Sequence, residues 1–406
     1  MKTKCFLLFL FTLCFSFLFS QYKYDNSIYK NIYVEDLCKQ LEEHPKHLLL
    51  DVRSPGEYAD TSSYTNLNIG RLKDAVNINI RELDKRWKEL LPYKNEPVYI
   101  YCSHSQRSRR ASKMLADSGF TNIINVNGGM TNYNLQKNIS ALCSSSLYQT
   151  SNTYQLVSPL NLIALLNTEK NIFLLDIRKD SAFKGISAFE EQNAFGRIKG
   201  AMNIPVSEVE NNLDKIPADK KIIVIDSYGD ESPAVATKLA GKGYKDVMIL
   251  FNGMALWTGV GNIASKEKYW EHSKTYHLLT AEEFDKQFKN NKDFLLLDVR
   301  TNDEFNNKAK DTWRNKGNLA GAVNIPFGEL MNRLKELDSY KNKSVVIYDF
   351  SGQNESFSAA KTLALSGFKN VYLMMDGIWD LRWKAANIKG LDYLNKWVVN
   401  VPTENL

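Results

Sequence analysis

The stretches 47-HLLLDVRSPGEY-58, 172-IFLLDIRKDSAF-183 and 294-FLLLDVRTNDEF-305 align without gaps and decide the fold. In each, a short and continuously apolar segment ends in an aspartate, and an arginine follows two residues later. Apolar segments without alternation are typical of strands buried on both faces, as in a parallel sheet covered by helices. The copies lie about 125 residues apart, a spacing too long for a solenoid repeat and suited to a whole domain.

Three further motifs recur in the same order in every copy. The first is the segment GRLKDAVNIN at 70–79, with GRIKGAMNIP at 196–205 and GNLAGAVNIP at 317–326. The second is an apolar strand that leads into a polar loop at Cys102, Asp226 or Asp349. The third is a helical segment stopped by glycine, followed by another apolar strand and an Asn/Asp/Gly turn. Strands that alternate with helices indicate a compact α/β domain.

The sequence therefore predicts an α/β protein of three tandem domains. We expect each to be a mainly parallel sheet flanked by helices on both faces. The expected boundaries are 25–142, 150–266 and 275–395, with linkers near 143–152 and 265–274.

Composition excludes several classes of protein. The 406 residues are 44% hydrophobic and 24% charged, which is ordinary for a globular chain. A net charge of +6 is spread without a long basic block, so we expect no nucleic-acid partner. No His/Cys cluster has metal-ligand spacing, so we expect no metal.

The N-terminus reads as a signal for export. Two lysines precede an apolar run at 6–19, which is shorter than the roughly 20 residues of a membrane-spanning helix. We interpret residues 1–20 as a cleaved signal peptide, with an uncleaved anchor as the alternative. The mature protein is then periplasmic or secreted, with no membrane contact after cleavage.

Export leaves three cysteines, Cys38, Cys102 and Cys143, and an odd number means that one is free or pairs between chains. A Cys38–Cys143 disulfide suits an oxidising compartment, but the spacing does not require it.

Together the motifs carry a resemblance. Asp-Val-Arg with a following Glu-aromatic pair, then Gly-Ala-x-Asn-Ile-Pro, then a strand ending in Tyr-Cys with Arg-Ser closing the loop, then a Gly-Gly turn, resembles the rhodanese (sulfurtransferase) homology domain. The resemblance covers nearly all of the mature chain, three times over. It implies an enzyme that needs no cofactor.

The loop of the first copy has the composition of an anion-binding site. Its backbone N–H groups and the start of the following helix offer partial positive charge, which stabilises a thiolate at its first position. Arg107 adds a clamp for an oxyanion, and Arg109 and Arg110 add positive charge. The candidate nucleophile is Cys102, and the candidate substrate-binding residues are Ser103, His104, Ser105, Gln106, Arg107 and Ser108.

The resemblance implies what this cysteine does. Cys102 attacks a small anionic sulfane-sulfur donor such as thiosulfate, becomes a persulfide, and passes the sulfur to a thiol or cyanide acceptor. Four residues, 103–106, separate Cys102 from Arg107, as in the sulfur-transferring members, whereas the related phosphatases have five. Ser105 replaces the glycine common at its position. Because a Cβ disfavours positive φ, we expect Ser105 to change the shape of this turn. We expect His104 at the rim and not as a base.

The other two copies lack the cysteine. Asp226 replaces it in the second copy, with Glu231 at the arginine position, and Asp349 replaces it in the third, with Asn354 at the arginine position. We expect each aspartate to fill the loop as an internal anion and both copies to be inactive. The inactive domains 2 and 3 then either cover the mouth of Cys102 or bind a protein partner.

One group of residues is expected to be structural. Asp51, Arg53 and Glu57 recur in the inactive third copy, so we interpret them as a polar network that holds the scaffold. Two alternatives to a sulfurtransferase remain: a non-catalytic binding or scaffold protein, and a phosphatase or arsenate-handling enzyme, which the short loop disfavours.

Overall fold

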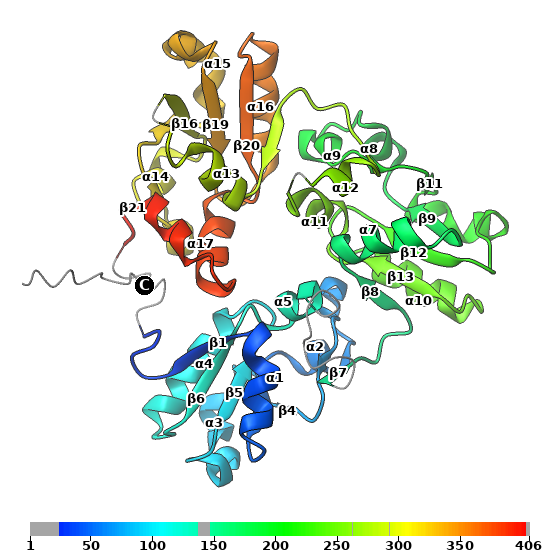
Figure 1. Ribbon diagram of the computed structural model, residues 1–406, viewed down its shortest axis with the longest axis vertical. Helices are drawn as coiled ribbons and strands as arrows, with labels where there is room; N and C mark the ends of the chain where they lie inside the picture. The colour runs from blue at the N-terminus through cyan, green and yellow to red at the C-terminus, as the bar shows by residue number, and fades with distance from the viewer. Residues whose placement is uncertain (1–23, 137–146, 262, 292, 403–406) are drawn as a thin grey trace, which may run out of the picture.

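The structure is a computed structural model that describes residues 24–136, 147–261, 263–291 and 293–402. The expected signal peptide, 1–20, lies outside the described residues. In Figure 1 three domains surround a common centre, domain 1 in blue to cyan, domain 2 in green and domain 3 in yellow to red. Within the described residues, no helix has the length and apolar character needed to cross a membrane.

Domain 1 is built on a five-stranded sheet with the order β1-β6-β5-β2-β4, in which all neighbours are parallel. Its elements are β1 (Lys30–Tyr33), α1 (Val34–Glu43), β2 (Leu48–Asp51), α2 (Pro55–Ala59), η1 (Thr65–Leu67), β3 (Arg71–Leu72), β4 (Val76–Asn77), α3 (Leu83–Arg86), η2 (Trp87–Tyr93), β5 (Val98–Tyr101), α4 (Gln106–Asp117), β6 (Ile123–Asn127), α5 (Gly129–Gln136) and β7 (Tyr148–Gln149).

Domain 2 repeats this sheet with the order β8-β13-β12-β9-β11, again all parallel. Its elements are β8 (Gln155–Val157), α7 (Pro159–Thr168), β9 (Ile172–Asp176), α8 (Asp180–Lys184), α9 (Glu190–Ala194), β10 (Arg197–Ile198), β11 (Met202–Asn203), η3 (Val206–Lys215), β12 (Lys221–Ile225), α10 (Ser232–Gly241), β13 (Val247–Leu250), α11 (Gly253–Gly259), α12 (Ala264–Glu267) and β14 (Trp270–Glu271).

Domain 3 has the same sheet with the order β15-β20-β19-β16-β18. Its elements are β15 (His277–Leu279), α13 (Ala281–Phe288), β16 (Phe294–Asp298), α14 (Asn302–Phe305), η4 (Thr312–Arg314), β17 (Asn318–Leu319), β18 (Val323–Asn324), α15 (Phe327–Arg333), η5 (Leu334–Tyr340), β19 (Ser344–Tyr348), α16 (Asn354–Leu365), β20 (Asn370–Met374), α17 (Gly377–Asn387), η6 (Asp392–Trp397) and β21 (Val398–Val399).

Helices cover both faces of each sheet, as the apolar runs predict. In domain 1, Leu49 and Tyr99 face a core that includes residues of α1 and α5. Their neighbours along the strands, Leu50 and Ile100, face a separate core that includes residues of α3 and α4. Because successive side chains of a strand point to opposite faces, a strand buried on both faces needs apolar residues at every position. The predicted fold of three tandem α/β domains is confirmed.

Each domain also closes with a short antiparallel ribbon. β3 pairs with β7, β10 with β14, and β17 with β21. The stretches expected to be linkers, 143–152 and 265–274, thus contain β7 and β14, which pair with the domain that precedes them. This pairing returns the chain to its own domain before the next one begins.

The domains share apolar cores and polar contacts. In domain 2, Phe195 packs edge-to-face on Phe357 of domain 3 at 6.3 Å between ring centroids. Thr65 of domain 1 donates to the carbonyl of Asp230 in domain 2 at 2.6 Å. The third interface, between domains 3 and 1, lies beside Cys102 and is described below.

The structure supports part of the prediction that one cysteine is free and that Cys38 forms a disulfide. Cys102 is free and buried. Cys38, in α1, is disulfide-bonded. Cys143, its predicted partner, lies outside the described residues.

Candidate active site at Cys102

Cys102 lies where β5 ends and the polar loop begins, and its side chain is 1% exposed. Residues 102–108 form this turn into α4 and are called the Cys102 loop. The carbonyl of Cys102 accepts the backbone N–H of Met130 at 2.9 Å, which ties the loop to the start of α5. Gly129 has φ +53°, and a Cβ at this position would collide with the Cys102 carbonyl. The glycine turn predicted from the sequence therefore packs directly against the loop.

Ser105 adopts the conformation that a glycine would. Its φ is +75° and its ψ is −22°, in the left-handed region. The equivalent positions of the two other loops are glycines, Gly229 with φ +84° and Gly352 with φ +70°. The Ser105 hydroxyl accepts the backbone N–H of Gly128 at 2.5 Å, so the side chain ties the loop to the following turn. The serine thus keeps the backbone path of its sister loops and adds a contact that glycine cannot make.

Arg107 is held by a carboxylate. Its guanidinium donates to both oxygens of Glu57, at 2.7 and 2.6 Å, and to the hydroxyl of Ser103 at 2.8 Å. Ser103 in turn donates to Glu57 at 3.1 Å. Burial favours the neutral form of Glu57, but the hydrogen bonds from Arg107 and Ser54 prevail and lower its pKa to about 2. The guanidinium of Arg107, predicted to bind an oxyanion, is therefore already paired with the carboxylate of Glu57. An anionic ligand must compete with Glu57 for this guanidinium.

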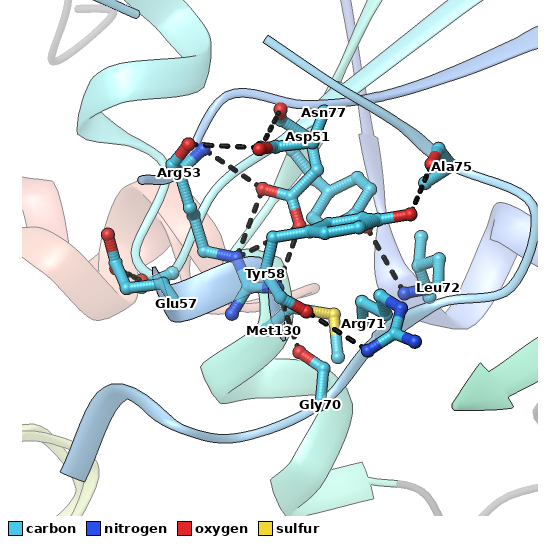
Figure 2. Close-up of polar contacts among 12 residues, drawn as sticks. Asp51, Arg53, Glu57, Tyr58, Gly70, Arg71, Leu72, Ala75, Asn77 and Met130 are labelled. Atoms are coloured by element: carbon cyan, nitrogen blue, oxygen red, sulfur yellow. Dashed lines mark hydrogen bonds and ion pairs between the residues drawn. The ribbon is translucent and has the colours of Figure 1, made fainter. Parts of the chain in front are cut away.

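This pairing refines the interpretation of Glu57 as a structural residue, because Glu57 also accepts the backbone N–H of Ser54 at 3.0 Å and so caps α2. Figure 2 shows the Arg53 guanidinium closed on Asp51 and the carbonyl of Gly70, while the side chain of Glu57 lies apart from this pair. Arg53 and Asp51 are both fully buried. Glu57 therefore combines the structural role of capping α2, which Glu304 repeats at α14 in domain 3, with a place at the mouth of the Cys102 loop.

The Asp–Arg pair itself is scaffold, as predicted. It recurs at 2.7 Å between Arg178 and Asp176 and at 2.6 Å between Arg300 and Asp298, in the two domains that lack the cysteine.

His104 is turned towards α5. Its Nε2 lies 3.1 Å from the hydroxyl of Thr131. Burial, with a smaller effect from the positive charge of Arg107, lowers the pKa of His104 to about 4. The imidazole is therefore neutral at physiological pH.

The remaining loop residues divide between surface and core. Gln106, the first residue of α4, is exposed, and Arg110, further along the same helix, is exposed as well. Ser108 is buried, and its hydroxyl lies 2.6 Å from Oδ1 of Asn125 and 3.0 Å from the carbonyl of Ser105. Ser108 thus supports the loop from beneath.

Arg109 does not supply free positive charge, contrary to expectation. It is buried and forms an ion pair with Asp25, and it donates to Oδ1 of Asn127 at 2.6 Å. Its charge is neutralised inside the protein.

The loop of domain 2 is filled by its own carboxylate, as predicted. Asp226 accepts the backbone N–H groups of Gly229, Glu231 and Ser232 at 2.7, 2.9 and 2.8 Å. Burial raises the pKa of Asp226, although these three hydrogen bonds oppose the effect. The N–H groups that would face a bound anion are already satisfied.

In domain 3 an aspartate carboxylate also fills the loop, and this loop is longer. Asp349 accepts the backbone N–H groups of Gly352 and Gln353 at 2.5 and 2.7 Å. Burial raises the pKa of Asp349 to about 6.

Helix register corrects the residue at the arginine position of this third loop. Ser356 donates to the carbonyl three residues earlier at 2.9 Å, as Ser108 does. Glu355, and not Asn354, therefore precedes this serine as Arg107 precedes Ser108. Five residues, 350–354, separate Asp349 from Glu355, one more than in the Cys102 loop.

A cavity of about 600 Å³ opens beside this third loop, with Glu304, Arg314 and Phe350 in its lining. Arg314 forms an ion pair with Glu304 and lies 4.6 Å from the ring centroid of Phe350. The Glu–Arg pair at the mouth is thus kept in domain 3, but its arginine comes from η4 and not from the loop.

Sequence alone pointed to the loop residues but missed Glu57 as the partner of Arg107. Charge gave a partial signal, because domain 1 has both the arginine and the carboxylate and domain 2 has neither, although domain 3 keeps the carboxylate Glu304 without a loop arginine. In domain 2, Glu231 occupies the arginine position and Ala182 the position of Glu57.

Comparison with known proteins agrees with the fold of the three domains. The family described as "Rhodanese-like domain" matches residues 34–136, 158–259 and 280–383. The uncharacterized protein YqhL of Bacillus subtilis is 32% identical over 113 residues, which are 28% of this chain and 79% of that protein. The thiosulfate sulfurtransferase PspE of Escherichia coli is 29% identical over 79 residues, covering 20% of this chain and 67% of that protein.

Among solved structures, a thiosulfate sulfurtransferase from Pseudomonas aeruginosa is similar, with 18% identity over 84% of this chain and 66% of that chain. Its TM-score is 0.23, so the likeness adds no argument about the site. The three family matches and the relatives support a function of the sulfurtransferase type. With one match on each of its three parallel sheets, the chain belongs to the rhodanese-like domain family.

Proposed function

We propose that the protein is an exported sulfurtransferase whose activity resides in domain 1, with Cys102 as the nucleophile. One observation carries this proposal. Each domain has a loop that joins a buried strand to a helix, and in two of the three a buried carboxylate accepts the loop's own N–H groups. In the first loop a free thiol stands in that place. A thiolate, and then the persulfide formed on it, would take the anionic role that the aspartates have in the sister loops.

The proposed reaction has two steps, and both are displacements at sulfur. The Cys102 thiolate attacks the outer sulfur of thiosulfate, the S–S bond of the donor breaks, and sulfite leaves with the electron pair. The cysteine now carries one extra sulfur as a persulfide. An acceptor thiolate, or cyanide, then attacks this outer sulfur and releases the Cys102 thiolate. No oxidant, reductant or cofactor enters the balance.

The side chains around the thiol have separate roles in this proposal. Arg107 lies at the mouth with its side chain one-third exposed, at 33%, so it is accessible to a sulfonate group. In the absence of a sulfur donor, Glu57 stays paired with Arg107. His104 is neutral and does not act as an acid near pH 7, because its pKa is about 4. Thiolate formation would depend on the loop N–H groups and the start of α4.

Intact-mass measurement of the purified protein after incubation with thiosulfate tests the proposal. We expect an adduct of about 32 Da, one sulfur atom, that is absent from Cys102→Ala and present in Asp226→Ala and Asp349→Ala. A protein without the adduct, or an adduct that survives in Cys102→Ala, overturns the proposal and favours a binding or scaffold role. Turnover of an aryl phosphate by Cys102 would favour the phosphatase alternative.

Export is part of the proposal and has its own support. Cys38 is disulfide-bonded, and structural disulfides persist in oxidising compartments. N-terminal sequencing of the protein recovered from a periplasmic or secreted fraction tests this. A protein found in the cytosol that still begins at Met1 contradicts it.

A further inference from the structure

Helix α17 of domain 3 reaches the Cys102 loop of domain 1. It has 11 residues, whereas its counterpart α11 in domain 2 has 7. Figure 1 shows α17, in red, extending from domain 3 towards domain 1. The indole Nε1 of Trp383 donates to the carbonyl of His104, inside the Cys102 loop, at 3.0 Å.

Neighbouring contacts fix this end of α17 on domain 1. Arg109, in α4, donates to the carbonyl of Ala386 at 3.1 Å and to Oδ1 of Asn387 at 3.3 Å. Beyond the helix, Lys389 lies 2.7 Å from Asp36 of α1. Arg109 and Asn387 are both buried, so the contact between them is shielded from water, whereas the Lys389–Asp36 pair is exposed. The docking holds Trp383 in place against the loop.

The bond from Trp383 orients one peptide of the loop. In a trans peptide the carbonyl and the following N–H point in opposite directions. With the His104 carbonyl held towards Trp383, the N–H of Ser105 points away from domain 3. A fixed N–H direction matters in this loop because its N–H groups are the expected donors to the anion at Cys102.

This same peptide joins the strained residue of the loop. A left-handed conformation is strained for a residue with a Cβ, and such a residue persists only when its surroundings hold it. Ser105 has φ +75° and is held on one side by the N–H of Gly128. Trp383 holds the peptide on the other side. The sister loops have Gly229 and Gly352 at this position, and glycine adopts the conformation without strain.

We propose that Trp383 of the inactive domain 3 is a positioning residue for the Cys102 loop, where its indole N–H holds the 104–105 peptide against the strain at Ser105. The proposal rests on the proposed activity of Cys102. It gives domain 3 a role in the reaction without any chemistry of its own. It also predicts that the need for Trp383 depends on the residue at position 105.

A double-mutant cycle tests this coupling. In Trp383→Phe we expect the rate of persulfide formation from thiosulfate to fall about five-fold, the size of one lost hydrogen bond. The rate of Cys102 alkylation by iodoacetamide should fall in parallel, because the thiolate loses an oriented donor. In the Ser105→Gly background, Trp383→Phe should change either rate less than about two-fold, because glycine removes the strain that the indole opposes.

Trp397→Phe is the matched control. It removes an indole N–H that donates to Asp285 within domain 3 at 2.9 Å, and it should leave both rates unchanged. Equal losses from Trp383→Phe in the serine and glycine backgrounds, or no loss in either, overturn the positioning role. A wild-type protein that forms no persulfide, yet shows the alkylation coupling, would reject the proposed function and leave the positioning role standing.

Discussion

The Cys102 loop and the Asp226 loop have the same length and differ in the source of their negative charge. In domain 2 the carboxylate of Asp226 accepts three backbone N–H groups of its own loop, so the site is complete without a ligand. In domain 1 the thiol of Cys102 takes that place, and the thiolate is also a nucleophile. The comparison teaches that one loop position is occupied by a carboxylate that satisfies the backbone N–H groups in domain 2 and by a free thiol in domain 1.

The mouths of the loops differ in a second way. In domain 1 the arginine of the loop pairs with Glu57, and in domain 3 the equivalent Glu304 pairs with Arg314 of η4. Domain 2 has Ala182 and Glu231 at the two positions and no such pair there. Only in domain 1 does the arginine of this pair come from the loop itself, the loop that begins with Cys102.

The largest effect on stability should come from the buried Asp–Arg pair that all three domains share. Arg53→Leu leaves the fully buried Asp51 without its guanidinium, which should lower the free energy of unfolding by about 3–5 kcal/mol. Arg178→Leu and Arg300→Leu are matched variants in the two other domains and should cost a similar amount. Chemical denaturation measures all three. A loss confined to Arg53→Leu would contradict the assignment of this pair to the scaffold.

The next effect concerns the internal anion of domain 3. The folded protein raises the pKa of Asp349 from 3.8 to about 6, so the stability from this group is complete below pH 4 and is lost as the pH rises through 6. Relative to wild type, Asp349→Asn should gain about 2 kcal/mol of unfolding free energy between pH 4 and pH 7. Denaturation at the two pH values measures this difference. Asp303→Asn, an exposed carboxylate of the same cavity, is the control, and a difference independent of pH would contradict the prediction.

The smallest effect should appear at the mouth of the Cys102 loop. Glu57→Gln removes the negative charge that holds Arg107, and we expect the KM for thiosulfate to fall about five-fold, or roughly 1 kcal/mol. Steady-state kinetics with thiosulfate measure it, and Glu304→Gln in domain 3 should change nothing. If kcat instead falls by orders of magnitude at constant KM, Glu57 shapes the loop and does not compete with the donor.

Much of the fold could be predicted because it depends on local pattern. Continuous apolar runs at β2, β9 and β16, repeated with the same flanking motifs, gave the sheets, the helices on both faces and the number of domains. The internal aspartates were also predictable, because a carboxylate at the start of a loop and helix has a local partner in the backbone.

The contacts that refine the site are long-range, and for that reason the sequence could not show them. Arg107 and Glu57 are 50 residues apart, and Trp383 and His104 are 279 apart. The buried pair of Arg109 with Asp25 depends on how the N-terminal segment packs. Letter-by-letter alignment placed Asn354 at the arginine position, because only hydrogen bonding in the helix reveals the extra residue.

That extra residue in the third loop separates the two domains without a loop cysteine in how many changes a loop like that of Cys102 would require. Domain 2 has a loop of the same length as the Cys102 loop, so substitutions alone would restore a thiol at Asp226 and a cation at Glu231. Domain 3 would need a deletion within 350–354 as well as substitutions. A loop like that of Cys102 is therefore open to domain 2 through point mutations, and for domain 3 it also requires a change in the length of the gene.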